Sequence, residues 1–173
     1  VWLQSLPFSR FSLFAQQGKL VNPQKMTYAR VETPTKPEWD GFGFLYSMDY
    51  LSSPGVFYCP AHTGNHPYDE YADIWPNLIA GRIVTNYHYR GSNATALYSD
   101  VASLALTADG LSTRSDFNHR SGANVLRLSL AVNFVADEDG ELLSSLPTEP
   151  DAADAVHGIR NAWAELDGIA ENE

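Results

Sequence analysis

The sequence predicts an α+β domain in which helical segments pack on a small antiparallel sheet and a C-terminal helix covers part of the body. Two segments indicate strands. Residues 83–89 alternate and are rich in β-branched and aromatic side chains, and residues 101–107 are apolar on both faces. A longer apolar segment follows at residues 123–135 and should be buried. The C-terminal helix is predicted by one apolar stripe with helical spacing, formed by Val156, Ile159, Trp163 and Leu166.

The length of 173 residues fits a single domain spanning 1–173. We expect residues 1–41 to form an N-terminal helix and an irregular lead-in. The body then occupies residues 42–136. The C-terminal helix covers residues 148–168 and ends at Gly168, because glycine readily adopts the left-handed conformation that closes a helix.

Charge and cysteine content exclude several classes of protein. The net charge is −10, so the chain repels a phosphate backbone and nucleic acid is not an expected partner. Cys59 is the only cysteine, which excludes an internal disulfide and a four-cysteine zinc site. No run of the sequence approaches the 18 continuous apolar residues of a membrane span. Because the sequence starts at Val1, we expect a processed or trimmed chain.

Three separated motifs carry a resemblance to one bacterial family. They are the run Val56-Phe57-Tyr58-Cys59-Pro60 after a Tyr- and Ser-rich segment, the aromatic segment 86–89, and the segment 115–126 with its Asn-His and Gly-x-Asn-Val-Leu pattern. The ending at 162–167 is also similar. Together they resemble pilin-like proteins, related to the pseudopilins of type II secretion, whose C-terminal head carries a His, nine residues and then Asp-Gly. The resemblance spans residues 45–167.

The sequence departs from that family at two points. After His119 and nine further residues stand Ser129 and Leu130 in place of Asp-Gly, and the family's N-terminal membrane helix is absent from this sequence. Asp-Gly suits a tight hairpin turn because glycine accepts a positive φ, and Ser-Leu does not. The departure weakens any site that uses the family's Asp.

The resemblance implies a pilin-like head that acts as a structural subunit of a bacterial surface filament or of a secretion-type, pseudopilus-like envelope assembly. The implied location is the cell envelope or the extracellular surface. The partners would be other protein subunits, copies of the chain itself among them. Membrane contact would come only through an N-terminal segment not present here. No cofactor is expected, although a cation such as calcium could bind.

Residues 123–135 allow two structures. In one continuous strand, an almost wholly apolar face would be formed by Asn124, Leu126, Leu128, Leu130, Val132 and Phe134. A hairpin centred on residues 129–130 would break that face. Because the resemblance extends beyond this point, we favour a hairpin with a longer or irregular turn.

The polar residues near this segment are the candidate site. Asp109, Asp116 and His119 could hold a cation or support hydrolysis. We favour a structural role, in which Asp116, Asn118 and His119 hydrogen-bond the backbone of a turn that leads through Gly122 into Asn124.

Other residues have simpler interpretations. Cys59 is expected to be a small buried hydrophobe, and Pro60 ends its strand-like run. His62 and His66 could share a metal from one helix, but the neighbouring Pro and Gly residues favour a polar loop. Exposed aromatic residues are candidate partner contacts, namely Tyr68, Tyr71 and Trp75.

Two alternative functions remain open. One is a metal-dependent surface or periplasmic hydrolase that uses His62, His66, His119 and nearby acids. The other is a monomeric extracellular module that binds a ligand or glycan.

Overall fold

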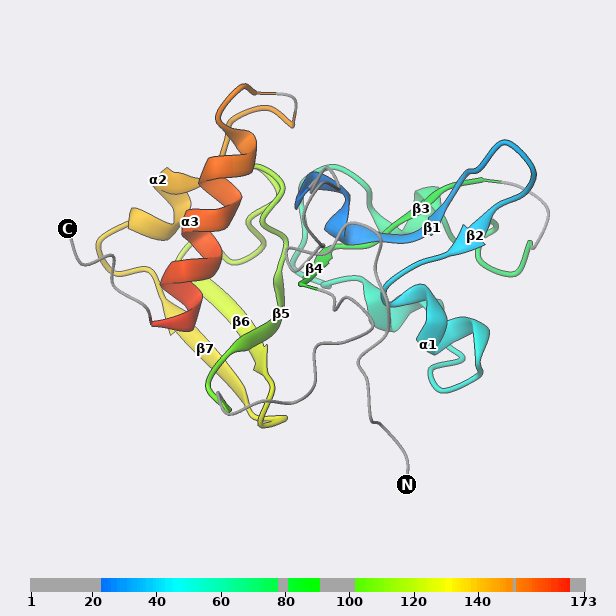
Figure 1. The fold of residues 1–173 in the computed structure, drawn as a ribbon, viewed down its shortest axis with the longest axis horizontal. Helices are drawn as coiled ribbons and strands as arrows, with labels where there is room; N and C mark the ends of the chain where they lie inside the picture. Colours follow the sequence, from blue (N-terminus) through cyan, green and yellow to red (C-terminus); the bar gives the residue numbers. More distant parts are fainter. Residues whose placement is uncertain (1–22, 78–80, 91–101, 151, 169–173) are drawn as a thin grey trace.

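The computed structural model describes residues 23–77, 81–90, 102–150 and 152–168. Helices combine with two antiparallel sheets, which confirms the α+β class. Figure 1 shows the sheet β2-β1-β3 with α1 on one side of the molecule and the sheet β4-β5-β6-β7 with α2 and α3 on the other.

The strands are β1 (Tyr28–Val31), β2 (Glu38–Trp39), β3 (Ile83–Val84), β4 (Tyr87–Tyr89), β5 (Ala105–Asp109), β6 (Gly122–Arg127) and β7 (Val132–Ala136). The helices are η1 (Pro23–Thr27), α1 (Gly43–Ser47), η2 (Pro54–Phe57), η3 (Tyr68–Glu70), α2 (Glu141–Ser145) and α3 (Ala155–Asp167).

An aromatic cluster forms the core beside the first sheet. Trp75 lies at its centre, is 0% exposed, and stacks on Phe57 with ring centroids 4.9 Å apart. Its Nε1 donates to the Tyr58 hydroxyl, which in turn donates to the Val84 carbonyl. These bonds satisfy the polar atoms that burial of Trp and Tyr removes from water.

The expectation that Tyr68, Tyr71 and Trp75 are exposed contacts is therefore wrong for two of them. Trp75 and Tyr71 are buried, and Tyr68 is half-buried against the Tyr58 ring. The polar loop around them suggested exposure, but the loop folds back and turns its rings inward.

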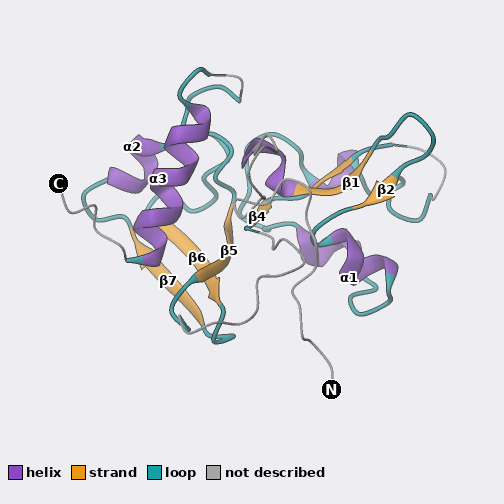
Figure 2. Cartoon of the chain, viewed as in Figure 1, coloured by secondary structure: helices purple, strands orange, loops and turns teal. Residues whose placement is uncertain are grey.

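Helices α2 and α3 cover one face of the second sheet (Figure 2). The buried face of α3 presents Ile159, Trp163 and Leu166, as the apolar stripe predicts, and Gly168 closes the helix at φ 70°. Val156, however, is exposed, because Ala155 takes the inward position at the start of the helix.

The predicted helix start at 148 is wrong, because α3 begins at Ala155. Pro150 disfavours helical backbone at the residue before it. A separate short helix, α2, precedes this bend, and the Asp137 carboxylate accepts bonds from the amides of Leu142 and Leu143 at its start. The acidic turn at 137–140 thus caps a helix.

The predicted strand at 83–89 is divided between the two sheets. Ile83–Val84 pairs with β1, whereas Tyr87–Tyr89 pairs with β5. Between them the Thr85 hydroxyl donates to the Thr27 carbonyl, and the Asn86 amide donates to the Phe57 carbonyl. These bonds replace ladder bonds and let the chain cross from one sheet to the other.

Other predicted segments differ less. The strand predicted at 101–107 is β5, shifted to Ala105–Asp109, with Asp109-Gly110 ending it as expected. The predicted N-terminal helix lies outside the described residues. Within the described residues, no helix combines the length and apolar character needed to cross a bilayer.

Residues 122–136 form a hairpin, which confirms the preferred interpretation. The Arg127 amide donates to the Ala131 carbonyl, and the Leu130 amide donates to the Arg127 carbonyl, so a three-residue loop joins β6 to β7. Leu130 adopts φ 66°, the left-handed position of such a loop. Gly122 enters β6 at φ 152°, and a Cβ there would overlap the Val135 carbonyl oxygen.

The odd loop length keeps residues of the same parity on one face of the hairpin. The register pairs Asn124 with Phe134 and Leu126 with Val132, so the two strands keep the apolar set on one face. That face is the open one. Leu130, Val132 and Phe134 are 72%, 65% and 52% exposed, contrary to the expectation of a buried apolar run. The core instead receives Ala123 and Val125, the residues of opposite parity.

A buried ion pair ties α3 to the second sheet. Arg90 Nη1 and Nη2 lie 2.8 and 2.6 Å from the two Asp167 carboxylate oxygens. Arg90 also donates to the Ala105 carbonyl, and Asp167 accepts from the Ala105 amide. The guanidinium lies 4.9 Å from the Trp163 ring. The pair therefore joins β4, β5 and the end of α3.

We expect Asp167→Ala to lower the free energy of unfolding by about 3–5 kcal/mol, because it leaves a buried guanidinium without its anion. Urea unfolding would measure the loss. Glu165→Ala, on the exposed side of the same helix turn, is the matched control and should change stability little. Equal effects of the two substitutions would contradict the role of the pair.

We expect Leu130→Gly to raise the free energy of unfolding by about 1 kcal/mol, because a non-glycine residue in the left-handed region costs roughly 1–2 kcal/mol and glycine loses some of that gain to chain entropy. Leu130→Ala removes the same exposed side chain but keeps the Cβ. A stability gain in the alanine variant equal to that in the glycine variant would argue against backbone strain.

Candidate functional site

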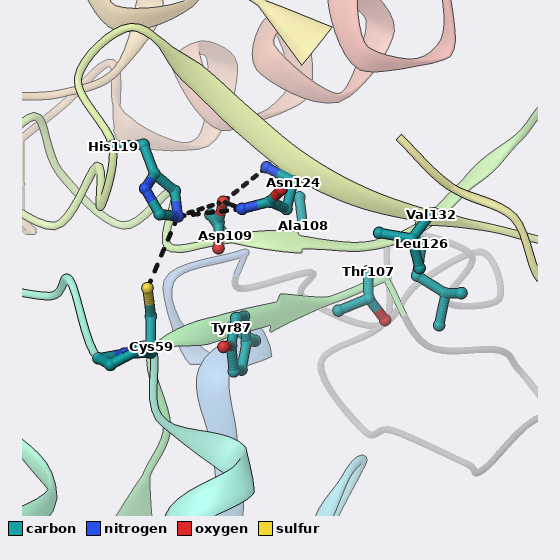
Figure 3. Close-up of a pocket in the computed structure, with 10 residues that line it drawn as sticks. Cys59, Tyr87, Thr107, Ala108, Asp109, His119, Asn124, Leu126 and Val132 are labelled. Atoms are coloured by element: carbon teal, nitrogen blue, oxygen red, sulfur yellow. Dashed lines mark hydrogen bonds and ion pairs between the residues drawn. The ribbon is translucent and has the colours of Figure 1, made fainter. Parts of the chain in front are cut away.

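A cavity of about 390 Å³ lies on the open face of the second sheet (Figure 3). Its base is formed by two cross-strand rows. One row is polar and contains Tyr87, Asp109 and Asn124, and the other contains Thr107, Leu126 and Val132. The cavity thus has a polar end and a more apolar end.

Two loops add residues to the polar end. Cys59 and Pro60 follow η2 and Tyr58, and so reach the cavity from the side of the first sheet. His119 comes from the loop before β6. In Figure 3 the Cys59 and His119 side chains point toward one another above the polar row. Residues separated by 60 positions are thereby brought into contact.

Asp109 is the most strongly held group of the site. Its side chain is 1% exposed. Its Oδ2 accepts a bond of 2.6 Å from the Asn124 backbone amide and one of 3.1 Å from Asn124 Nδ2. Charge-assisted bonds of this kind fix the direction of a carboxylate.

His119 directs Nε2 at three neighbours. This nitrogen lies 3.4 Å from Asp109 Oδ2, 3.0 Å from Asn124 Nδ2 and 3.7 Å from Cys59 Sγ. Asn124 Nδ2 can donate to this nitrogen in the tautomer whose Nε2 carries the lone pair. The Phe134 ring packs edge-on against the imidazole at 6.3 Å. His119 therefore links the loop before β6 to Asn124 on that strand, and it also belongs to a compact polar cluster.

Cys59 is buried, as expected, but it is not surrounded by apolar groups alone. Burial raises the pKa of the Cys59 thiol, and the nearby Asp109 carboxylate raises it further. Burial also raises the pKa of Tyr87, beside the thiol, to about 12. The thiol is consequently protonated near neutral pH, which disfavours a free thiolate nucleophile.

Asp116 belongs to a different network. Its Oδ2 accepts from the Thr113 hydroxyl at 2.8 Å, and its Oδ1 accepts from the Asn65 amide at 3.1 Å. Of the three cation candidates, the structure therefore brings together Asp109 and His119 and adds Cys59 in place of Asp116. The sequence offered one signal for this addition, namely the Cys-Pro pair in a motif that precedes the His motif.

The two loops that flank this second network are joined by side chains. His62 Nδ1 contacts Asn118 Oδ1, and Asn118 Nδ2 donates to the Asn86 carbonyl. His62 and His66 lie in irregular structure, as predicted for a polar loop. His66 has φ 65°, and its Nδ1 lies 2.6 Å from the Tyr71 hydroxyl.

Comparisons with known proteins supply no relative for this chain. No family model, curated protein or solved structure matches it.

We expect the chain to lose stability as the pH falls below about 6.5, partly through His66. Burial lowers the pKa of His66 in the folded chain, so the unfolded chain binds the proton more readily in this pH range. His66→Asn keeps a residue that tolerates positive φ and should flatten this pH dependence. Urea unfolding at pH 7 and 5.5 measures it. His157→Asn, on the exposed side of α3, is the control. An unchanged slope in the His66 variant would contradict the assignment.

Proposed function

We propose that this chain is the head of a structural subunit in a bacterial surface filament or secretion-type envelope assembly, and that it works through contacts with copies of itself. The proposal places the chain at the cell envelope or the extracellular surface. The observation that carries it is the exposed apolar face of the β6–β7 hairpin.

That face has the character of a contact surface. Leu130, Val132 and Phe134 lie on one side of a single hairpin and are each more than half exposed. They border the apolar end of the cavity through Val132 and Leu126. Isolated exposed apolar residues are common, whereas a contiguous group is typical of protein interaction sites.

The edge of the sheet adds to this surface. Among the described residues, β7 pairs with β6 on one side and with no strand on the other. An unprotected edge offers backbone donors and acceptors to another chain. Charges that would block pairing are absent from β7, whose sequence is Val-Asn-Phe-Val-Ala. The hairpin thus combines apolar side chains with open backbone groups.

The loop geometry supports the resemblance to pilin-like heads. Leu130 occupies the position at which that family has the glycine of Asp-Gly, and it adopts φ 66°. Glycine is the residue that such a position favours. The hairpin therefore keeps a backbone suited to Asp-Gly although the sequence has Ser-Leu. Ser129 accepts a long bond from the Ala131 amide on its Oγ.

A monomeric ligand-binding module is the second candidate. The cavity volume of about 390 Å³ lies within the range of small-molecule sites, roughly 300–1,000 Å³. Its polar end and apolar end could orient a small amphipathic ligand. This function requires no self-association, so oligomeric state separates the two candidates.

We expect the purified chain to self-associate in sedimentation experiments, and Val132→Glu to weaken association at least tenfold, or about 1.4 kcal/mol. A buried glutamate at the contact would lose its hydration without gaining a partner.

Val56→Glu is the matched control, because Val56 is 51% exposed and belongs to η2, outside the hairpin. A monomer at every concentration up to the solubility limit would contradict the subunit proposal and favour the binding module. Equal weakening by both substitutions would remove the hairpin as the contact.

A further inference from the structure

Three side chains at the polar end of the cavity offer one sulfur, one nitrogen and one oxygen atom to a common point. Cys59 Sγ, a carboxylate oxygen of Asp109 and a ring nitrogen of His119 all lie within 4.8 Å of one another. They come from three segments, namely the loop after η2, the end of β5 and the loop before β6. This is a mixed donor set, which distinguishes it from a surface group of acids.

Two of the three ligand–ligand distances match the edges of a tetrahedral zinc site. Zinc bonds of about 2.3 Å to sulfur and about 2.0–2.1 Å to nitrogen and oxygen give ligand separations of about 3.6 Å for S···N and about 3.4 Å for N···O. The observed Sγ···Nε2 and Nε2···Oδ2 distances are 3.7 and 3.4 Å. An ion could therefore enter with little movement of the ligands.

We propose that Cys59, Asp109 and His119 bind one Zn²⁺ or a similar late first-row divalent cation at this point, with a fourth coordination position open to the cavity. Thiolate and imidazole favour such ions over calcium, which takes only oxygen ligands in larger number. The donor set therefore favours a softer metal than the calcium that the sequence left open.

The surroundings orient the ligands as metal sites require. The Asn124 backbone amide and Nδ2 both donate to Asp109, and the Phe134 ring lies edge-on to the imidazole at 6.3 Å. Outer groups of this kind typically change metal affinity 10–100-fold. On binding, Asn124 Nδ2 gives up its contact with His119 Nε2 and keeps its bond to Asp109.

Metal binding at Cys59 requires the thiol to lose its proton, because the thiolate is the form that binds a metal. A bound divalent cation deprotonates a coordinating thiol outright and neutralises the charge that burial disfavours. The proton leaves to solvent, and the thiolate electron pair forms the bond to the metal.

The open fourth position faces the remainder of the cavity. Thr107, Leu126 and Val132 line that space, so water or one donor atom of a small ligand can complete the coordination. Three protein ligands with one open position are typical of metal sites that bind an exchangeable group. The metal would also link the Cys59 loop to the second sheet.

The test is titration of the purified, metal-stripped chain with Zn²⁺ and with Co²⁺. We expect one ion per chain, an increase in thermal stability with Zn²⁺, and a Co²⁺ spectrum that has a thiolate charge-transfer band and intense tetrahedral d–d bands. Cys59→Ser and His119→Gln should each weaken Zn²⁺ binding at least about 100-fold and remove or shift these bands. His157→Gln, an exposed histidine on α3, should leave affinity and spectrum unchanged.

Circular dichroism of each metal-free variant shows whether it is folded. If a Cys59 or His119 variant fails to fold, the Co²⁺ spectrum of the wild-type chain still decides, because only Cys59 can supply a thiolate band. Three results would each overturn the site. They are Co²⁺ binding without that band, a metal affinity no higher than that of a control peptide that lacks histidine, and equal affinity in all variants. None of these readouts depends on self-association.

Discussion

The Arg90–Asp167 pair is the interaction on which the second half of the molecule depends. Its two charges are almost fully removed from water, a state that is stable only when both partners and their hydrogen bonds are present. The pair fixes the end of α3 against the ends of β4 and β5. Since β4 and β5 supply Tyr87 and Asp109, this link also sets the base of the cavity.

Asp109, in the site, is a second buried charge that depends on its hydrogen-bond partners. A buried carboxylate requires donors, and Asn124 provides two from the neighbouring strand. These bonds leave Asp109 facing His119 and place Cys59 within reach of both. Backbone pairing of β5 with β6 holds Asp109 beside Asn124, and the loop that leads into β6 supplies His119. A loop from the other sheet supplies Cys59, so the site depends on how the two halves pack.

The open face of the second sheet combines two kinds of chemistry. Its polar end has the geometry of a metal site, and its apolar end continues into the exposed hairpin face of Leu130, Val132 and Phe134. The left-handed Leu130 is retained at a cost to stability, and strained positions of this kind concentrate at functional sites.

The sequence alone determined the α+β class, much of β4 to β6 and the end of α3 at Gly168. Each follows from local periodicity or from a residue with a strong backbone preference. The hairpin at 122–136 is favoured only by the family resemblance, because the periodicity of this segment is that of one continuous strand. The sequence placed Asp109 and His119 among the candidate cation ligands, but it did not include Cys59 among them. It also predicted that Trp75 and Tyr71 are exposed, whereas both are buried.

Tertiary structure decided which face of the hairpin is buried, which periodicity cannot predict. A period of two says which residues share a face, but not which face meets the helices. The three-residue loop and the packing of α2 and α3 turned the apolar set of the hairpin outward. Likewise, contact between Cys59 and His119 depends on the packing of two sheets, because no local pattern relates residues so far apart in sequence.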